Sequence, residues 1–168
     1  MSKYAEIFEY LRSCPQLANL WTIGATEDVG VRVVLPQGAS PAVQYEEYVD
    51  STGTYCCDII PYPSVYEDYQ INCYQWLDAE DGSAPEENVN VLSLDEVQKI
   101  CDWITQQNDI NNLPNITGRK VISVESNPCV PQIRYVTPGE NTICYFVTMR
   151  IRYVNTAQRK SVEHEYMD

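Results

Sequence analysis

The chain has 168 residues and is strongly acidic, with 24 Asp and Glu residues against 11 Lys and Arg and a formal net charge of −13. Its length fits one domain with one core, and its 44% hydrophobic content indicates a folded chain rather than a disordered acidic tail. The charge disfavours binding to nucleic acid or to an anionic membrane surface, and no apolar run reaches the ~20 residues of a membrane-spanning helix.

The first predicted element is a helix from Ser2 to about Ser13. Its apolar residues recur at helical spacing, Ser2 precedes them as an N-cap, and Pro15 ends the segment. The segment has neither a basic start nor a continuous apolar stretch. We therefore expect no signal peptide and a protein that is kept inside the cell.

Three strands are predicted next, over residues 29–35, 54–60 and 65–77. Between the first two, residues 45–53 carry a Ser-Thr-Gly turn that joins two extended pieces. In the third strand, residues alternate between the two faces of the predicted sheet. One face carries Tyr69, Ile71 and Cys73, and the other carries Gln70, Asn72 and Tyr74.

A capping box predicts the second helix. Ser93 is expected at its N-cap with Glu96 three residues later, and the helix is expected to run to about Gln107. Residues 78–90 precede it and are expected to form a solvated acidic loop, since they lack the oxygen spacing of a calcium-binding loop.

The last third of the chain is predicted to be β, with strands over residues 120–125, 131–137 and 142–154. Residues 1–154 are therefore expected to form a single domain of the α+β class, a mainly antiparallel twisted sheet with two helices packed on one face. Residues 155–168 are expected to be a polar C-terminal tail that is mobile in a monomer.

No pattern for catalysis, cofactor binding or metal binding is found. The seven cysteines are an odd number without regular spacing or a C-x-x-C pair, so most are expected to be reduced core residues. The one histidine, His164, has no partner at ligand spacing. Cys56 and Cys57 point to opposite faces of a strand, so they do not converge on one ligand. We expect no enzymatic activity, no cofactor and no metal.

The 13 tyrosines favour an interaction surface, because tyrosine combines apolar area with a polar tip. The alternative is that tyrosine is simply a good residue for a half-buried strand. The charge is also polarised: residues 1–118 hold 4 basic and 19 acidic residues, and residues 119–168 hold 7 basic and 5 acidic ones. Such asymmetry suits head-to-tail assembly, although it is also compatible with unevenly solvated charge. The residues predicted at a subunit or partner interface are Tyr48, Tyr69, Tyr74, Arg134, Arg150 and Arg152.

Two patterns carry a resemblance to a known family. The first is W-I-x-x-Q-N, which starts at Trp103 and is followed, after four further residues, by Leu113-Pro114. The second is Y-x-V-x-x-x-I-x-Y in the strand from Tyr145 to Tyr153. Together with the order of the elements over residues 1–154, they make the chain similar to the tail terminator proteins of long-tailed phages, also called tail completion or minor capsid proteins in prophages of Gram-positive bacteria.

The resemblance implies a structural role without any reaction. Similar proteins form a hexameric ring on the end of the tail tube, stop its polymerisation and offer a surface to the head–tail connector protein. It implies self-association, with a lone subunit monomeric in isolation, and the tail tube protein and the connector as partners. DNA would only pass through the lumen of the ring. The protein would reside in the host cytoplasm during assembly and then at the head–tail junction of the virion.

Other functions stay open at the level of the sequence. Within the same system, the chain could be a head–tail connector (neck) protein or a tail tube subunit. From other classes, a small hydrolase that uses acidic residues and a ligand-binding α+β module are the alternatives. An enclosed pocket holding a close pair of carboxylates would favour the hydrolase.

Overall fold

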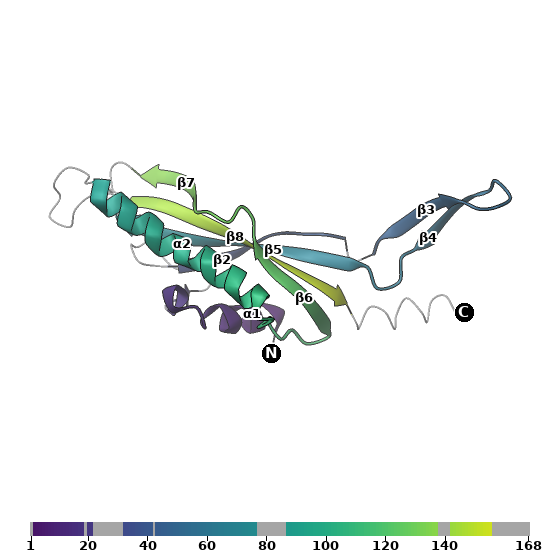
Figure 1. Cartoon of the computed structure of the whole chain (residues 1–168), viewed down its shortest axis with the longest axis horizontal. Helices are drawn as coiled ribbons and strands as arrows, with labels where there is room; N and C mark the ends of the chain where they lie inside the picture. The colour runs from purple at the N-terminus through teal and green to yellow at the C-terminus, as the bar shows by residue number, and fades with distance from the viewer. Residues whose placement is uncertain are drawn as a thin grey trace.

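The computed structural model describes residues 2–18, 20–21, 32–41, 43–76, 87–137 and 142–155. The predicted α+β class is confirmed: two helices accompany a mainly antiparallel sheet (Figure 1). The elements in chain order are α1 (Lys3–Leu11), the short 3-10 helix η1 (Pro15–Leu17), β1 (Leu20–Trp21), β2 (Arg32–Ala39), β3 (Tyr45–Val49), β4 (Tyr55–Ile59), β5 (Ser64–Trp76), α2 (Glu87–Asp109), β6 (Arg119–Ser126), β7 (Gln132–Thr137) and β8 (Thr142–Asn155).

The main sheet is built around the long antiparallel pair of β5 and β8. Their register runs without a break from Ser64 opposite Val154 to Trp76 opposite Thr142. The strand order is β1-β2-β5-β8-β6, and β7 also pairs with β8. Because β6 pairs with the end of β8 and β7 with its beginning, the two short strands share one side of β8.

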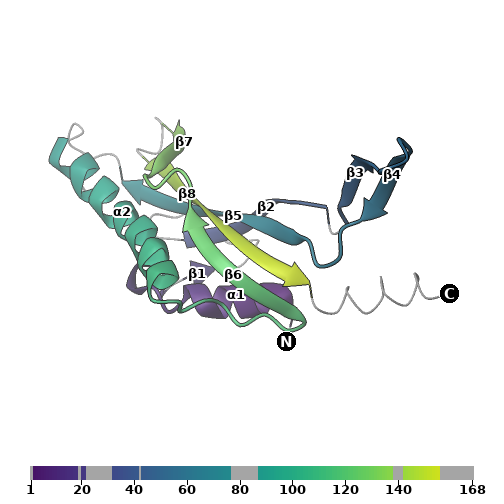
Figure 2. The same ribbon diagram turned by 45° about the vertical axis from the view of Figure 1, so that its right-hand side comes forward.

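One face of this sheet forms the core, and both helices cover it (Figure 2). The alternation predicted for β8 is confirmed, since its inward residues are all buried; they are Ile143, Tyr145, Val147, Met149, Ile151 and Tyr153. Helix α1 contributes Ile7, Phe8 and Leu11 to this core, and the three residues lie on one side of the helix. Ser2 caps this helix as predicted, because its hydroxyl accepts a hydrogen bond of 3.2 Å from the Ala5 amide.

Neither α1 nor α2 covers the other face of the sheet (Figure 2). A small apolar cluster of Val33, Tyr74 and Cys144 lies at one end of it. The end nearer the start of β5 carries charged side chains instead, including Asp68 and Arg150. We call this the open face of the sheet.

Strands β3 and β4 form a separate two-stranded sheet. Their hairpin extends beyond the end of the main sheet, away from the helices (Figures 1 and 2). The predicted turn between two extended pieces is thus confirmed, but the structure places these strands outside the main sheet. We call the segment from Tyr45 to Ile59 the hairpin arm.

The predicted start of the second helix is wrong. Helix α2 begins at Glu87, so Ser93 lies inside the helix and is buried rather than capping its end. An acidic residue at a helix start is favoured by the helix dipole, and a Ser-x-x-Glu pattern is not restricted to helix ends. Residues 87–90 of the predicted acidic loop therefore belong to α2, and residues 78–86 lie outside the described residues.

The predicted end of the first strand is also wrong. Strand β2 continues through Pro36 to Ala39, with a register shift between Pro36 and Gly38. Proline lacks an amide hydrogen, so it is tolerated where a strand has no hydrogen-bonded neighbour on one side. Pro36 lies beyond the part of β2 that pairs with β1, because β1 pairs only with Arg32 and Val33. Of the predicted polar tail, Asn155 is the last residue of β8 and the others lie outside the described residues.

Candidate functional site

The hairpin arm has one apolar face. Its register sets Tyr45 opposite Ile59, Glu47 opposite Cys57 and Val49 opposite Tyr55. Because side chains alternate along a strand, these three pairs share one face of the hairpin. Tyr45 is 61% exposed, Val49 66% and Tyr55 63%. Within the described part of the chain, this apolar face is therefore open to solvent.

The opposite face of the hairpin arm is polar. Here Glu46 lies opposite Asp58 and Tyr48 opposite Cys56. The Tyr48 hydroxyl donates a hydrogen bond of 2.7 Å to Asp58 Oδ2. This bond, together with the charge of Asp58, raises the pKa of Tyr48 to about 12. The hairpin is thus amphipathic, although its apolar face also holds Glu47, whose hydrogen bond with Tyr55 raises the pKa of that tyrosine.

The turn of the hairpin arm is organised by one carboxylate. Asp50 Oδ1 accepts hydrogen bonds from the Thr52 amide at 2.9 Å, the Thr54 amide at 3.0 Å and the Thr52 hydroxyl at 2.6 Å. These bonds, led by the one from the Thr52 hydroxyl, lower the pKa of Asp50. Gly53 has φ +81°, a conformation that L side chains adopt rarely.

Replacing Asp50 by Ala should loosen the hairpin arm without unfolding the body. The substitution removes the acceptor for two turn amides, whose hydrogen bonds then have to be made with water. We expect hydrogen exchange of the Thr52 and Thr54 amides to become several-fold faster, with β5 and β8 unchanged. Ser51→Ala, at an exposed position in the same turn, is the control. Unchanged exchange in Asp50→Ala would show that the carboxylate does not hold the turn.

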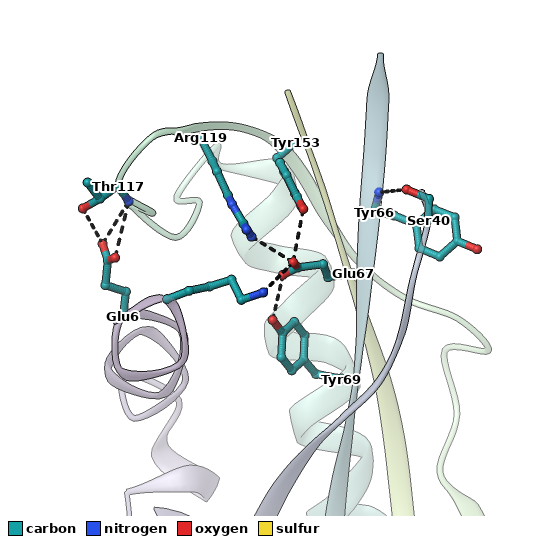
Figure 3. Close-up of polar contacts among 9 residues, drawn as sticks. Glu6, Ser40, Tyr66, Glu67, Tyr69, Thr117, Arg119 and Tyr153 are labelled. Atoms are coloured by element: carbon teal, nitrogen blue, oxygen red, sulfur yellow. Dashed lines mark hydrogen bonds and ion pairs between the residues drawn. The ribbon is translucent and has the colours of Figure 1, made fainter. Parts of the chain in front are cut away.

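An ionic cluster centred on Glu67 fastens α1 to the sheet (Figure 3). Glu67 Oε1 accepts hydrogen bonds from Lys3 Nζ at 2.8 Å, Arg119 Nη1 at 2.8 Å and the Tyr153 hydroxyl at 3.1 Å. Its Oε2 accepts one from the Tyr69 hydroxyl at 2.8 Å. Both carboxylate oxygens are therefore used inside the subunit.

The pKa values in this cluster follow from burial and charge. Burial by itself would raise the pKa of Glu67, but the hydrogen bonds from Lys3 and Tyr69 and the two positive charges outweigh it and lower that pKa. Burial, followed by the charge of Glu67, raises the pKa of Tyr153 to about 12. A carboxylate that stays ionised and fully hydrogen-bonded suits a structural role better than proton transfer.

The arginines predicted at an interface are paired inside the subunit. Arg150 makes a two-pronged contact with Asp68 at 2.7 and 2.9 Å, and its guanidinium lies 3.8 Å from the centre of the Tyr66 ring. Arg152 contacts Glu125 at 3.1 Å. Reversing both charges would break these two pairs as well as any contact with a neighbour, so it would not isolate an interface.

The predicted tyrosines separate into two groups. Tyr48 is exposed on the hairpin arm, whereas Tyr69 and Tyr74 are buried in the subunit itself. Neither residue presents a surface to a partner, because Tyr69 is only 1% exposed on the core face and Tyr74 only 6% exposed on the open face. Arg134 is exposed on β7, with Nη1 3.4 Å from Asn72 Oδ1. The six residues thus lie in several places rather than in one site.

Sequence reasoning missed two features. The first is the apolar face of the hairpin arm, which the alternation Tyr45-x-Glu47-x-Val49 on one side of the turn and Tyr55-x-Cys57-x-Ile59 on the other could have indicated. The second is the cluster around Glu67. No sequence signal could have found it, because Lys3, Glu67 and Arg119 are far apart in the chain.

The W-I-x-x-Q-N pattern lies at the end of α2 and has a structural role. Ile104 is buried in the core, and Trp103 packs against Tyr10 of α1 with ring centres 5.3 Å apart. Gln107 Oε1 accepts a hydrogen bond of 2.6 Å from Asn112, and Asn111 takes φ +57°, as is usual after a helix end. The pattern therefore closes α2 against α1.

Four of the seven cysteines are buried, as predicted for most of them: Cys14, Cys73, Cys101 and Cys144. Cys57 and Cys129 are exposed, and Cys56 is half-buried. The described residues contain no disulfide and no group of three or more His, Cys, Asp or Glu that could hold a metal ion. A surface depression of about 330 Å³ beside Glu67, between Tyr4 and the edge of β2, is open to solvent.

None of the helices that the structure describes is long and apolar enough to cross a membrane. The chain matches no protein-family model. A comparison with curated proteins also found no significant match.

Proposed function

We propose that this chain is a structural virion protein of a phage or prophage that caps the tail tube as a ring. In this role it ends tube polymerisation and joins the tail to the head connector, and it catalyses no reaction. It would act in the host cytoplasm during assembly and then at the head–tail junction. Its partners would be further copies of itself, the tail tube protein and the connector, with DNA only passing through the lumen.

The observation that carries the proposal is the uncovered apolar face of the hairpin arm. An isolated two-stranded hairpin is only marginally stable in water, and exposed contiguous apolar surface is typical of protein–protein contacts. A protein that joins like subunits and two different partners needs such projecting surfaces. The body supplies a rigid base for the arm, because the long pair of β5 and β8 is continuous over its whole register.

The charge distribution supports the same role. No Lys or Arg occurs between Val33 and Gln98, whereas five of the basic residues lie between Arg119 and Arg152. Opposite charge on different parts of one subunit favours association in which unlike surfaces meet. An acidic lumen would also let DNA pass without binding its phosphates.

The test is a tube-assembly experiment with a tail tube protein from the same genome. Negative-stain images should show tubes that are shorter than those formed without it and that end in a six-fold ring. Incorporation along the whole tube would identify a tube subunit instead. Binding to the connector without any effect on tube length would identify a neck protein. Tubes of unchanged length and uncapped ends would contradict the terminator role.

A further inference from the structure

Within the described part of the chain, the two outer edges of the hairpin arm are unpaired. Strands β3 and β4 pair only with each other there, and the arm extends beyond the end of the main sheet (Figures 1 and 2). A free strand edge presents a row of amide and carbonyl groups, which is a ready template for a further strand. The arm therefore offers its edges for association as well as its apolar face.

The hydrogen bonds inside the arm show which backbone groups point outward. The Ile60 amide donates to the Gln44 carbonyl oxygen at 2.8 Å. The Asp50 amide donates to the Thr54 carbonyl oxygen at 3.0 Å. Bonded and non-bonded pairs alternate along an antiparallel ladder, so the even-numbered residues of both strands bond inward. The amides and carbonyls at positions 55, 57 and 59 therefore point outward from β4, and those at 45, 47 and 49 point outward from β3.

Charge decides which edge is suited to pair with a second copy, because like charges directly opposite each other destabilise a strand pair. Two copies of β3 paired antiparallel about their centre would set Glu47 opposite Glu47. Pairing β3 of one copy with β4 of another in the register of the arm would set Glu46 opposite Asp58, a like-charge pair that the arm already contains. Pairing β4 with β4 about Cys57 creates no such pair, because Asp58 then lies opposite Cys56.

The sequence of β4 is also suited to pair with itself. With Cys57 at the centre, Tyr55 of each copy lies opposite Ile59 of the other, and pairs of an aromatic with a β-branched residue stabilise a sheet. Tyr55 is 63% exposed, Cys57 is exposed and Ile59 is half-buried. The hydroxyl of Tyr55 stays hydrogen-bonded to Glu47 of its own chain, so its exposed ring is the part that meets the other copy.

We infer that β4 pairs antiparallel with β4 of a second copy of this chain, about a two-fold axis at Cys57. The outward residues of the two strands then form hydrogen-bonded pairs, and the two hairpins become one continuous sheet. A sheet of three or more strands with an apolar face is more stable than an isolated hairpin. Because the paired strands run in opposite directions, the two main sheets lie at opposite ends of the contact. Pro61 has no amide hydrogen and ends the edge just beyond Ile59.

This contact goes beyond the proposed function. It joins identical surfaces and therefore gives a dimer, whereas a ring is built from contacts between different surfaces. It uses the edge of β4 and leaves the apolar face of the arm open to other partners. Because the contact is short, we expect a reversible dimer that forms at high protein concentration.

Charged substitutions at the two-fold axis test the contact. Cys57→Glu alone and Cys57→Lys alone should each weaken dimerisation by about tenfold in sedimentation equilibrium, because each sets like charges opposite each other. An equimolar mixture of the two variants should dimerise again, because opposite charges then meet. Glu47→Gln is the matched control and should dimerise like the wild type, since Glu47 lies opposite Cys57 within the arm and away from the contact.

Three outcomes of this experiment would overturn the inference. The first is a mixture that associates no better than either variant alone. The second is stronger association of Cys57→Lys alone, which would indicate that β4 pairs with Glu47 and β3 of the other copy. The third is a wild-type chain that stays monomeric up to its solubility limit.

Oxidation of the native cysteine at the axis gives a second test. In a hydrogen-bonded antiparallel pair the Cα atoms lie about 5.5 Å apart, which a disulfide can span. In the variant Cys56→Ser, Cys129→Ser, Cys57 is the one cysteine that is not buried. Mild oxidation with copper phenanthroline should join Cys57 to Cys57, as identified by peptide mass spectrometry, and a further Cys57→Ser change should prevent it. A chain that sediments as a dimer but forms no such disulfide would contradict the contact.

These outcomes separate the inference from the proposed function. Dimers joined at Cys57 without any effect on tube length would support the contact and contradict the terminator role. Capped tubes formed by a chain that does not dimerise at Cys57 would support the terminator role and contradict the contact.

Discussion

Removing the apolar face of the hairpin arm should abolish the self-association proposed above while leaving the chain folded. In the variant Tyr45→Ser, Val49→Thr and Tyr55→Ser, three exposed side chains lose most of their apolar area. At about 1 kcal/mol for each side chain buried in a contact, the dissociation constant should rise about 100-fold or more. Sedimentation equilibrium measures this change.

The control for this variant is Ile110→Thr. Ile110 is 62% exposed directly after α2, so the change removes similar apolar surface from another part of the subunit. Exposed positions contribute little to folding stability, so both variants should unfold at wild-type temperature. Unchanged association of the triple variant would show that the arm does not carry subunit contacts.

Glu67→Gln should destabilise the subunit by about 2–3 kcal/mol, because breaking a buried ion pair leaves its partners without a counter-charge. In the variant, the ammonium of Lys3 and the guanidinium of Arg119 lose the carboxylate that both contact at 2.8 Å. For a chain of this length, the midpoint of thermal unfolding should fall by roughly 4–12 °C. Calorimetry or unfolding in urea checks both values.

The matched control is Glu125→Gln. Glu125 pairs with Arg152, but both side chains are about two-fifths exposed, so this pair should contribute less than about 1 kcal/mol. A loss of stability in Glu67→Gln no larger than that in Glu125→Gln would contradict the structural role of the cluster around Glu67.

The effect of Glu67 should also depend on pH in a defined direction. Its pKa is lower in the folded chain than in the unfolded chain, where an ordinary glutamate has a pKa of about 4.3. The carboxylate therefore stabilises the fold fully above that value and loses its contribution as the pH falls through the lower, folded pKa. The stability difference between the wild type and Glu67→Gln should be constant from neutral pH to about 5 and shrink in more acidic solution.

The cluster around Glu67 and the hairpin arm both lie near the start of β5, but they have different physical characters. In the cluster around Glu67, the charges are paired with each other and hold α1 on the sheet. The cluster therefore stabilises the fold of the single chain. The hairpin arm has hydrogen bonds of its own but leaves large apolar side chains in solvent, where an isolated hairpin is only marginally stable. A rigid body with one projecting apolar surface fits the assembly role proposed above.

The sequence by itself determined the elements whose alternation or capping is local. The core face of β8 was correctly predicted because a long strand with one covered face must place apolar residues at every second position. The first helix was correctly predicted to within two residues because Ser2 caps it and its apolar residues recur at helical spacing. The α+β class followed from the order of these elements.

Only the tertiary structure decided which tyrosines and arginines are available to a partner. Tyr69 and Tyr48 belong to similar strand patterns, yet Tyr69 is covered by the core and Tyr48 is exposed on the arm. Arg150 and Arg152 are paired because β5, β8 and β6 bring Asp68 and Glu125 beside them across the sheet. The exposure of a strand residue and the partner of a charge depend on neighbours that are distant in the chain, and no local pattern encodes them.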